Sequence, residues 1–300
     1  MKQIAFRSFF LFSFLVFFSL ILGMETAFST PSLYSAIRRV DDPGQSPALP
    51  EPSTQKRAAI VIDDFGNKMG GTEDMLALPF PITVAVMPFL QTTKADAEAA
   101  HAAGKEVIIH LPMEPKIARK SWLGPGVIST DLTNDEIRKR VHAAIDEVPH
   151  AIGINNHMGS KATGDERVMK LVLEVCKERG LFFLDSHTNY WSIACRKAKE
   201  VGVPCIENHL FLDDIHTKKH ISQQVRLLDK HLKEHSTCVT IGHVGRYGSL
   251  TAAVLREQIP ALTEKSGIRI VRISELVPKP KAPQRPPGEP HIGKEAKAGR

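Results

Sequence analysis

The chain has 300 residues, 42% hydrophobic and 24% charged, a composition typical of a globular protein and unlike that of a disordered or fibrous one. Its formal net charge is +6, but six basic and only two acidic residues lie in the segment 278–300, so the segment 57–277 is close to neutral. A nucleic-acid-binding protein needs a basic face on its folded domain, so this distribution argues against a nucleic-acid partner.

The N-terminal segment has the pattern of a signal peptide. Lys2 and Arg7 precede an apolar run, Phe9–Gly23, that is shorter than the roughly 20 apolar residues of a comfortable membrane span. Small residues follow, so we predict a signal peptide over 1–29, cleaved after Ser29, with an uncleaved anchor as the alternative. Either form places the folded part outside the cytoplasm, in the periplasm or cell envelope, and the cleaved form keeps no stable membrane span.

Two proline-rich segments flank the centre of the chain. The segment 30–56 contains five prolines among Ser, Gly and Asp, which is typical of a linker. The segment 278–300 is basic, rich in proline and almost without apolar residues, so it cannot bury enough surface to offset its ordering entropy. We predict a disordered tail there and a folded domain over 57–277.

Strand and helix patterns alternate along this domain. Thr133 and Glu136 form a capping box that opens a helix to about Glu147, and helical stripes follow in Asp165–Arg179 and around Ile221–Leu232. Repeated β-α units of this length imply a parallel sheet, and we predict an α/β fold, a distorted (β/α) barrel of seven to eight mostly parallel strands. No nucleotide-binding glycine motif is present. The candidate strands are Ala58–Asp63, Ile82–Met87, Glu106–His110, Ala151–Asn155, Leu181–Asp185, Pro204–Glu207, Cys238–Ile241 and Ile268–Arg272.

Several of these strands end in side chains that bind metals or transfer protons. Parallel α/β folds place their chemistry at the carboxyl ends of the strands, so these side chains should share one rim. Carboxylate and imidazole suit zinc and similar divalent metals. Asp63 and Asp64 point to opposite faces if the strand continues through both, which would leave one as a metal ligand and the other as a base. The residues are Asp63, Asp64, His110, His157, His187 and His243.

The arrangement of these motifs resembles the divergent polysaccharide deacetylase family, a branch of the NodB-like carbohydrate esterases, over about residues 57–277. The resemblance implies Asp63 as general base, Asp64 and His110 as metal ligands, and His243 as general acid. Glu114 stands where the superfamily has a second histidine, so Glu114, His157 and His187 are all candidates for the third ligand. We predict His157, with His187 as the alternative. The arginine-proline-tyrosine motif of ordinary members is absent.

The resemblance implies an exported hydrolase that uses one divalent metal, zinc by preference, to remove acetyl groups from N- or O-acetylated envelope polysaccharide. Glu114, Asn156 and Asp185 are then expected to bind the substrate, and loop aromatics could stack on sugar rings (Trp122, Tyr190 and Trp191). Two alternatives remain. One is a non-catalytic glycan-binding or envelope-assembly protein on the same barrel, and the other is a metallohydrolase with a different substrate.

The four cysteines are interpreted in two pairs. Cys195 and Cys205 are the closest pair and could form a disulfide in an exported protein. Cys176 falls on the apolar face of a predicted helix and Cys238 begins a strand, which favours buried small hydrophobic residues. No C-x-x-C motif is present, which argues against a zinc site built from cysteines.

Overall fold

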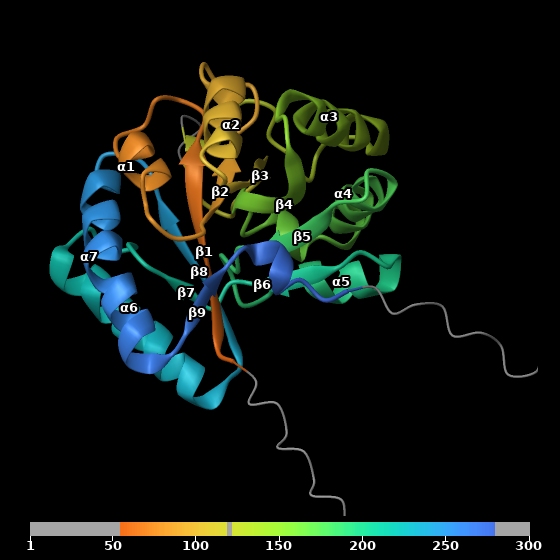
Figure 1. Cartoon of the computed structure of the whole chain (residues 1–300). Helices are drawn as coiled ribbons and strands as arrows, with labels where there is room; N and C mark the ends of the chain where they lie inside the picture. The colour runs from red at the N-terminus through yellow and green to blue at the C-terminus, as the bar shows by residue number, and fades with distance from the viewer. Residues whose placement is uncertain (1–54, 119–121, 280–300) are drawn as a thin grey trace, which may run out of the picture. The chain divides into compact units, whose positions relative to one another are not determined.

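The computed structural model describes residues 55–118 and 122–279 (Figure 1). The predicted signal peptide, the linker up to residue 54 and the tail from residue 280 lie outside the described residues. No helix of the described ranges has the length and apolar character needed to cross a membrane.

The core of the fold is a curled sheet of nine strands, and every pairing between them is parallel. Its order is β6-β5-β4-β3-β2-β1-β8-β7, with β9 paired to the first three residues of β1. None of the pairings of the described residues joins β6 to β7, so the barrel is open. The predicted α/β fold with a distorted (β/α) barrel is confirmed, with nine strands in place of the predicted seven to eight. The strands are β1 (Arg57–Phe65), β2 (Thr83–Val86), β3 (Glu106–Met113), β4 (Ala151–Met158), β5 (Phe182–Asp185), β6 (Cys205–Glu207), β7 (Leu210–Phe211), β8 (Thr237–His243) and β9 (Arg269–Val271).

Helices lie along the outside of the sheet (Figure 1). The predicted capping box is present at the start of α3, where Thr133 Oγ1 accepts from the N–H of Glu136 and the Glu136 carboxylate accepts from the N–H of Thr133. All eight predicted strands are present, whereas β7 was missed because a two-residue strand is too short to show a period. The helices are α1 (Thr72–Leu76), α2 (Thr93–Ala102), α3 (Asn134–Glu147), α4 (Glu166–Glu178), α5 (Ala194–Val201), α6 (Lys218–Glu234) and α7 (Gly248–Ser266), with short 3₁₀ turns η2 (Ala162–Gly164) and η3 (Ile273–Glu275).

Alternation along the strands gives the sheet two buried faces. In β1, Ala58, Ile60 and Ile62 pack with the helices in an outer core. Ala59 and Val61 face the other way and belong to an inner core within the curl of the sheet. The other inner-core residues are Ala85, Ile108, Phe182, Leu184, Val239, Ile241 and Ile273. The side chains that follow these residues by two positions at the carboxyl ends of the strands therefore face the inside of the curl.

A disulfide joins Cys195, in the first turn of α5, to Cys205, the first residue of β6. This confirms the predicted pair. Cys176 and Cys238 are free and buried, as the sequence indicated.

Removing this disulfide should lower the free energy of unfolding by about 2–3 kcal/mol, because a loop of this size is then free in the unfolded chain. Urea unfolding of a Cys195→Ala/Cys205→Ala double variant measures the loss. Reductant should destabilise the native protein by a similar amount and leave the double variant unchanged. If reductant destabilises the double variant as well, the disulfide is not the source of the effect.

Candidate metal centre

Three donor atoms from three strands converge at the carboxyl end of the sheet. Asp64 Oδ1 lies 3.3 Å from His110 Nε2 and 3.2 Å from His157 Nδ1. The two nitrogens are 3.0 Å apart. In a tetrahedral zinc site with bonds of about 2.0–2.1 Å, neighbouring donor atoms are about 3.3 Å apart. The spacing of Asp64, His110 and His157 thus suits a divalent metal of that size.

Strand register explains how these residues meet. β3 and β4 are neighbours, and His157 is paired with Pro112, two residues beyond His110. Asp64 has a φ of 72°, and the pairing of β1 with β2 shifts between Ile62 and Phe65. The strand therefore does not continue regularly through both aspartates, and the expectation that they point to opposite faces does not apply.

The hydrogen bonds of the two histidines favour a cation between them. His110 Nδ1–H donates to Asn155 Oδ1 at 2.8 Å, and His157 Nε2–H donates to the carbonyl oxygen of Trp122 at 2.9 Å. The facing nitrogens, His110 Nε2 and His157 Nδ1, then carry lone pairs. Asp64 Oδ1 is buried and has no hydrogen-bond partner among the described residues. Two lone pairs and an unpartnered carboxylate oxygen in contact fit a bound metal, and the outer hydrogen bonds are those that orient metal-binding imidazoles.

The carboxylates and imidazoles of this group shift each other's pKa values toward the charged forms. Burial alone would raise the pKa of Asp64, but the two imidazoles hold it well below its usual range. Burial alone would lower the pKa of His110, but Asp63 and Asp64 raise it. Without a metal, a proton shared with the imidazoles would compensate the buried carboxylates.

Asp63 lies next to this group on the inner face of the sheet. It is almost fully buried, and Asn155 Nδ2 donates to its Oδ1 at 2.9 Å. Its Oδ2 is 3.6 Å from His110 Nδ1, which is too far for a hydrogen bond. Burial raises the pKa of Asp63 above its ordinary value, although His110 and His243 oppose this. A buried carboxylate of raised pKa, not included in the metal-binding group, is suited to accept a proton.

His243, the last residue of β8, is paired with Asp63 across the β1–β8 register. Its Nδ1–H donates to Asp213 Oδ1 at 2.8 Å, and its backbone N–H donates to Asp213 Oδ2 at 2.9 Å. Thr251 Oγ1 also donates to Asp213 Oδ2. Burial alone would lower the pKa of His243, but Asp213 outweighs it, with help from Asp64 and Asp63, and the pKa rises to about 9.

Sequence reasoning missed Asp213 and Asn155. The signal for Asp213 was available, because Leu212-Asp213-Asp214 repeats the apolar-to-carboxylate pattern of Ile62-Asp63-Asp64. It was overlooked because β7 was not predicted.

Two predicted metal ligands lie elsewhere. His187 is not in the group of donor atoms at Asp64; it is exposed on the loop after β5, and its ring packs edge-on against Tyr190. The carboxylate of Glu114 is engaged by Lys161 Nζ at 2.7 Å and by the N–H and Oγ1 of Thr130. Both were candidates for the third ligand, whereas the third donor atom that lies beside Asp64 and His110 belongs to His157.

Internal hydrogen bonds also engage the other residues expected to bind substrate. Asn156 Oδ1 accepts from the N–H of Ser186, and its Nδ2 donates to the carbonyl of Met158. Asp185 accepts from the N–H of His187 and from Ser192 Oγ. These hydrogen bonds hold the loops of the rim, and substrate binding by Glu114, Asn156 and Asp185 stays a prediction.

A cleft of about 370 Å³ opens beside the site and is lined by Asp64, Asp213, His243, Arg246 and Tyr247 among others. Its size is within the range of small-ligand sites. The loop aromatics Trp122, Tyr190 and Trp191 are exposed, and their stacking on sugar rings stays a prediction.

A parallel α/β sheet with an aspartate and two histidines at its carboxyl rim, beside a separate carboxylate and an aspartate-bound histidine, is typical of metal-dependent hydrolases. Residues 60–277 match the divergent polysaccharide deacetylase family, and the chain belongs to that family.

The chain is also similar to two proteins of known sequence and, in fold, to one solved structure. The chain is 35% identical over 233 residues to the uncharacterized protein YibQ of Escherichia coli (strain K12), covering 78% of this chain and 71% of that one. It is 35% identical over 189 residues to an uncharacterized protein of Haemophilus influenzae, covering 63% and 67%. The crystal structure of an uncharacterized protein from Agrobacterium tumefaciens C58 superimposes with a TM-score of 0.69 at 19% identity, covering 76% of this chain and 91% of that one.

Proposed function

We propose that the protein is an exported, metal-dependent deacetylase that acts on N- or O-acetylated polysaccharide of the cell envelope. The observation that carries the proposal is the convergence of Asp64, His110 and His157 on one point, with Asp63 and His243 beside it. Family membership supports an acetylated polysaccharide as the substrate class. The non-catalytic alternative was favoured by the missing second-motif histidine and the missing arginine-proline-tyrosine motif. The position of His157 beside Asp64 and His110 weakens the first of these two grounds.

The nucleophile would be a water molecule activated at this centre. A divalent ion such as zinc, when bound, would polarise the acetyl carbonyl and lower the pKa of a water molecule bound to it. Asp63 would accept the proton that this water loses as it attacks, and Asn155 holds the carboxylate in place for that transfer. The raised pKa of Asp63 makes it a stronger base than an exposed aspartate.

The leaving group needs a proton, because an amine departs poorly as an anion. His243 Nδ1 is fixed by Asp213, which leaves Nε2 as the nitrogen that can give a proton to the departing group. A pKa of about 9 keeps this imidazole protonated at neutral pH. Asp63 and His243 thus divide the work of base and acid at paired positions of β1 and β8.

Export is supported by two independent features. The N-terminal segment has a basic start and an apolar run. The disulfide between Cys195 and Cys205 is of the kind that persists in oxidising compartments.

Acetate release tests the proposal. The protein should release acetate from acetylated envelope glycans, lose this activity after treatment with a chelator, and regain it on addition of zinc. His110→Ala should lower the metal content by one equivalent with the fold retained. Binding of the glycan without acetate release at any metal loading would support the non-catalytic alternative, and release from other acetylated substrates alone would support a different metallohydrolase.

A further inference from the structure

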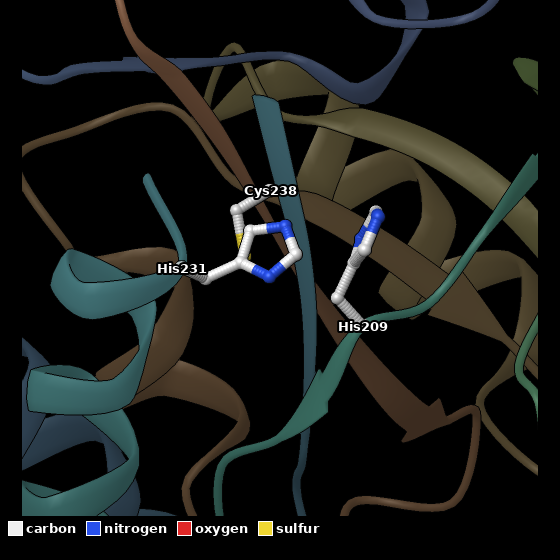
Figure 2. A group of neighbouring side chains, drawn as sticks. All are labelled: His209, His231 and Cys238. Atoms are coloured by element: carbon white, nitrogen blue, oxygen red, sulfur yellow. The ribbon is translucent and has the colours of Figure 1, made fainter. Parts of the chain in front are cut away.

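A second group of donor side chains lies apart from the rim. The ligand atoms of His209, His231 and Cys238 all lie within 4.8 Å of one another. In the view of Figure 2, His231 and His209 lie on either side of β8, and Cys238 projects from the strand toward His231. The three residues come from three segments, because His209 precedes β7, His231 is on α6 and Cys238 is the second residue of β8.

This group is distinct from the centre at Asp64. Cys238 belongs to the outer core between the sheet and the helices, whereas the residues of the rim face the inside of the curl. Cys238 and His243 lie at opposite ends of β8, about 16 Å apart at the usual rise of a strand. A ligand at one group therefore does not touch the other.

His231 has a donor atom without a partner. Its Nε2 is buried and has no hydrogen bond among the described residues. Burial and the neighbouring ring of His235 lower the pKa of His231, and partial burial and the ring of His231 lower the pKa of His209. A neutral imidazole is the form that binds a metal. A buried imidazole nitrogen without a hydrogen-bond partner is uncommon in folded proteins. Its lone pair can be satisfied by a hydrogen-bond donor or by a bound cation.

Cys238 adds a sulfur donor. It is free, fully buried and makes only a weak contact with the carbonyl of Val239, at 3.9 Å. Burial raises the pKa of its thiol to about 12, so solvent alone does not deprotonate it. A bound metal ion does, because a coordinated thiol loses its proton to solvent. One thiolate with two imidazoles is a donor set that selects zinc and other thiophilic ions over magnesium or calcium.

His209 must change one hydrogen bond to join such a site. Its Nδ1 accepts from the N–H of Val239 at 3.0 Å, so the neutral ring carries its proton on Nε2. Binding a metal through either nitrogen removes the Val239 hydrogen bond, since Nδ1 is then protonated or occupied. Metal binding by His209 therefore breaks one hydrogen bond and forms one metal–ligand bond. His209 is exposed, which leaves room for its ring to turn.

We propose that His209, His231 and Cys238 bind a second metal ion, a thiophilic divalent cation of the zinc class, at the outer face of β8. The ion links α6 to β8 and keeps a fourth position open on the exposed side of His209. The absence of a C-x-x-C motif argued against a cysteine-containing site, but these ligands are distant in sequence and meet only through packing. The proposal goes beyond the proposed deacetylase function and does not depend on it.

Cobalt titration of the intact protein under argon, without reductant, tests the site. Cobalt bound to a thiolate gives a charge-transfer absorption that oxygen and nitrogen ligands do not give, so the centre at Asp64 is silent. The intensity of this band should correspond to one cobalt ion per protein. Hydrogen exchange at the Val239 amide should become faster. His110→Ala should keep the band while losing one equivalent of total metal, and Cys238→Ser should lose the band.

Cys176→Ser is the matched control, because Cys176 is also free and buried with a thiol pKa of about 12, but it belongs to no group of metal-binding side chains among the described residues. It should keep the band. His209→Ala alters an exposed side chain, so it should fold normally and weaken cobalt binding at least tenfold. A native protein without the band, or a band that survives both Cys238→Ser and His209→Ala, overturns the proposal. Loss of acetate release in His110→Ala with the sulfur band intact leaves it standing.

Discussion

Asp64→Asn should release the metal ion of the rim, whereas Asp63→Asn should keep it and still lower the rate by about 10²–10⁴-fold. Asp64 supplies the anionic donor of the Asp64–His110–His157 group, so a neutral amide there leaves two imidazoles to hold a divalent ion. Asp63 hydrogen-bonds to Asn155 outside that group, so its replacement removes a base and not a ligand. Metal content and acetate release measured on the same samples separate the two roles.

Excess zinc provides the internal control for this pair. It should partly restore Asp64→Asn, because weakened binding is recovered by mass action, and it should do nothing for Asp63→Asn. Loss of metal in Asp63→Asn with retention in Asp64→Asn would reverse the assignments. The pair is informative because the two side chains are adjacent in sequence and identical in chemistry.

Most of the site residues that the sequence predicts lie at the ends of strands. Asp63, Asp64, His110 and His243 each follow an apolar strand, and parallel pairing brings those ends together without any knowledge of side-chain packing. The register between neighbouring strands determines which residue supplies the third donor atom. A single sequence does not reveal that register. His157 is two residues beyond Asn155 on β4, which places it above His110, whereas His187 belongs to the next strand along the sheet.

Residues that act through another side chain were harder to find. Asn155 contributes through its hydrogen bonds to Asp63 and His110, Asp213 through its hydrogen bonds to His243, and Thr251 through its hydrogen bond to Asp213. The apolar-to-carboxylate pattern marks Asp213 itself, but nothing local in the sequence indicates which side chains these residues contact. Glu114 and Asp185 present the opposite difficulty. Their carboxylates lie at strand ends like those of the site, but nearby loop groups already donate to them. Polar residues at a rim therefore divide into those that face the cleft and those that hold its loops, and only contacts tell them apart.

Asp213→Asn should move the pKa of His243 from about 9 toward the ordinary value of about 6.5, because the hydrogen bond and charge of Asp213 are the largest of the influences that raise it, ahead of Asp64 and Asp63. A general acid works in its protonated form, so activity is retained below its pKa and lost above it. At pH 8 the variant should then be slower, by roughly thirtyfold for a complete shift to 6.5, while near pH 6 it should almost match the native protein. A pH profile of acetate release and an NMR titration of His243 in the metal-free protein measure the two shifts.

Thr251→Val is the matched control for Asp213→Asn, because it removes one hydrogen bond to Asp213 Oδ2 and keeps the carboxylate charge. Its pH profile should stay close to that of the native protein. A uniform loss of rate at every pH in Asp213→Asn, with the pKa of His243 unchanged, would show that Asp213 only supports the loop before α6. A shift of the alkaline limb alone identifies the carboxylate as the group that keeps His243 protonated, and this outcome separates electrostatic support of the acid from structural damage.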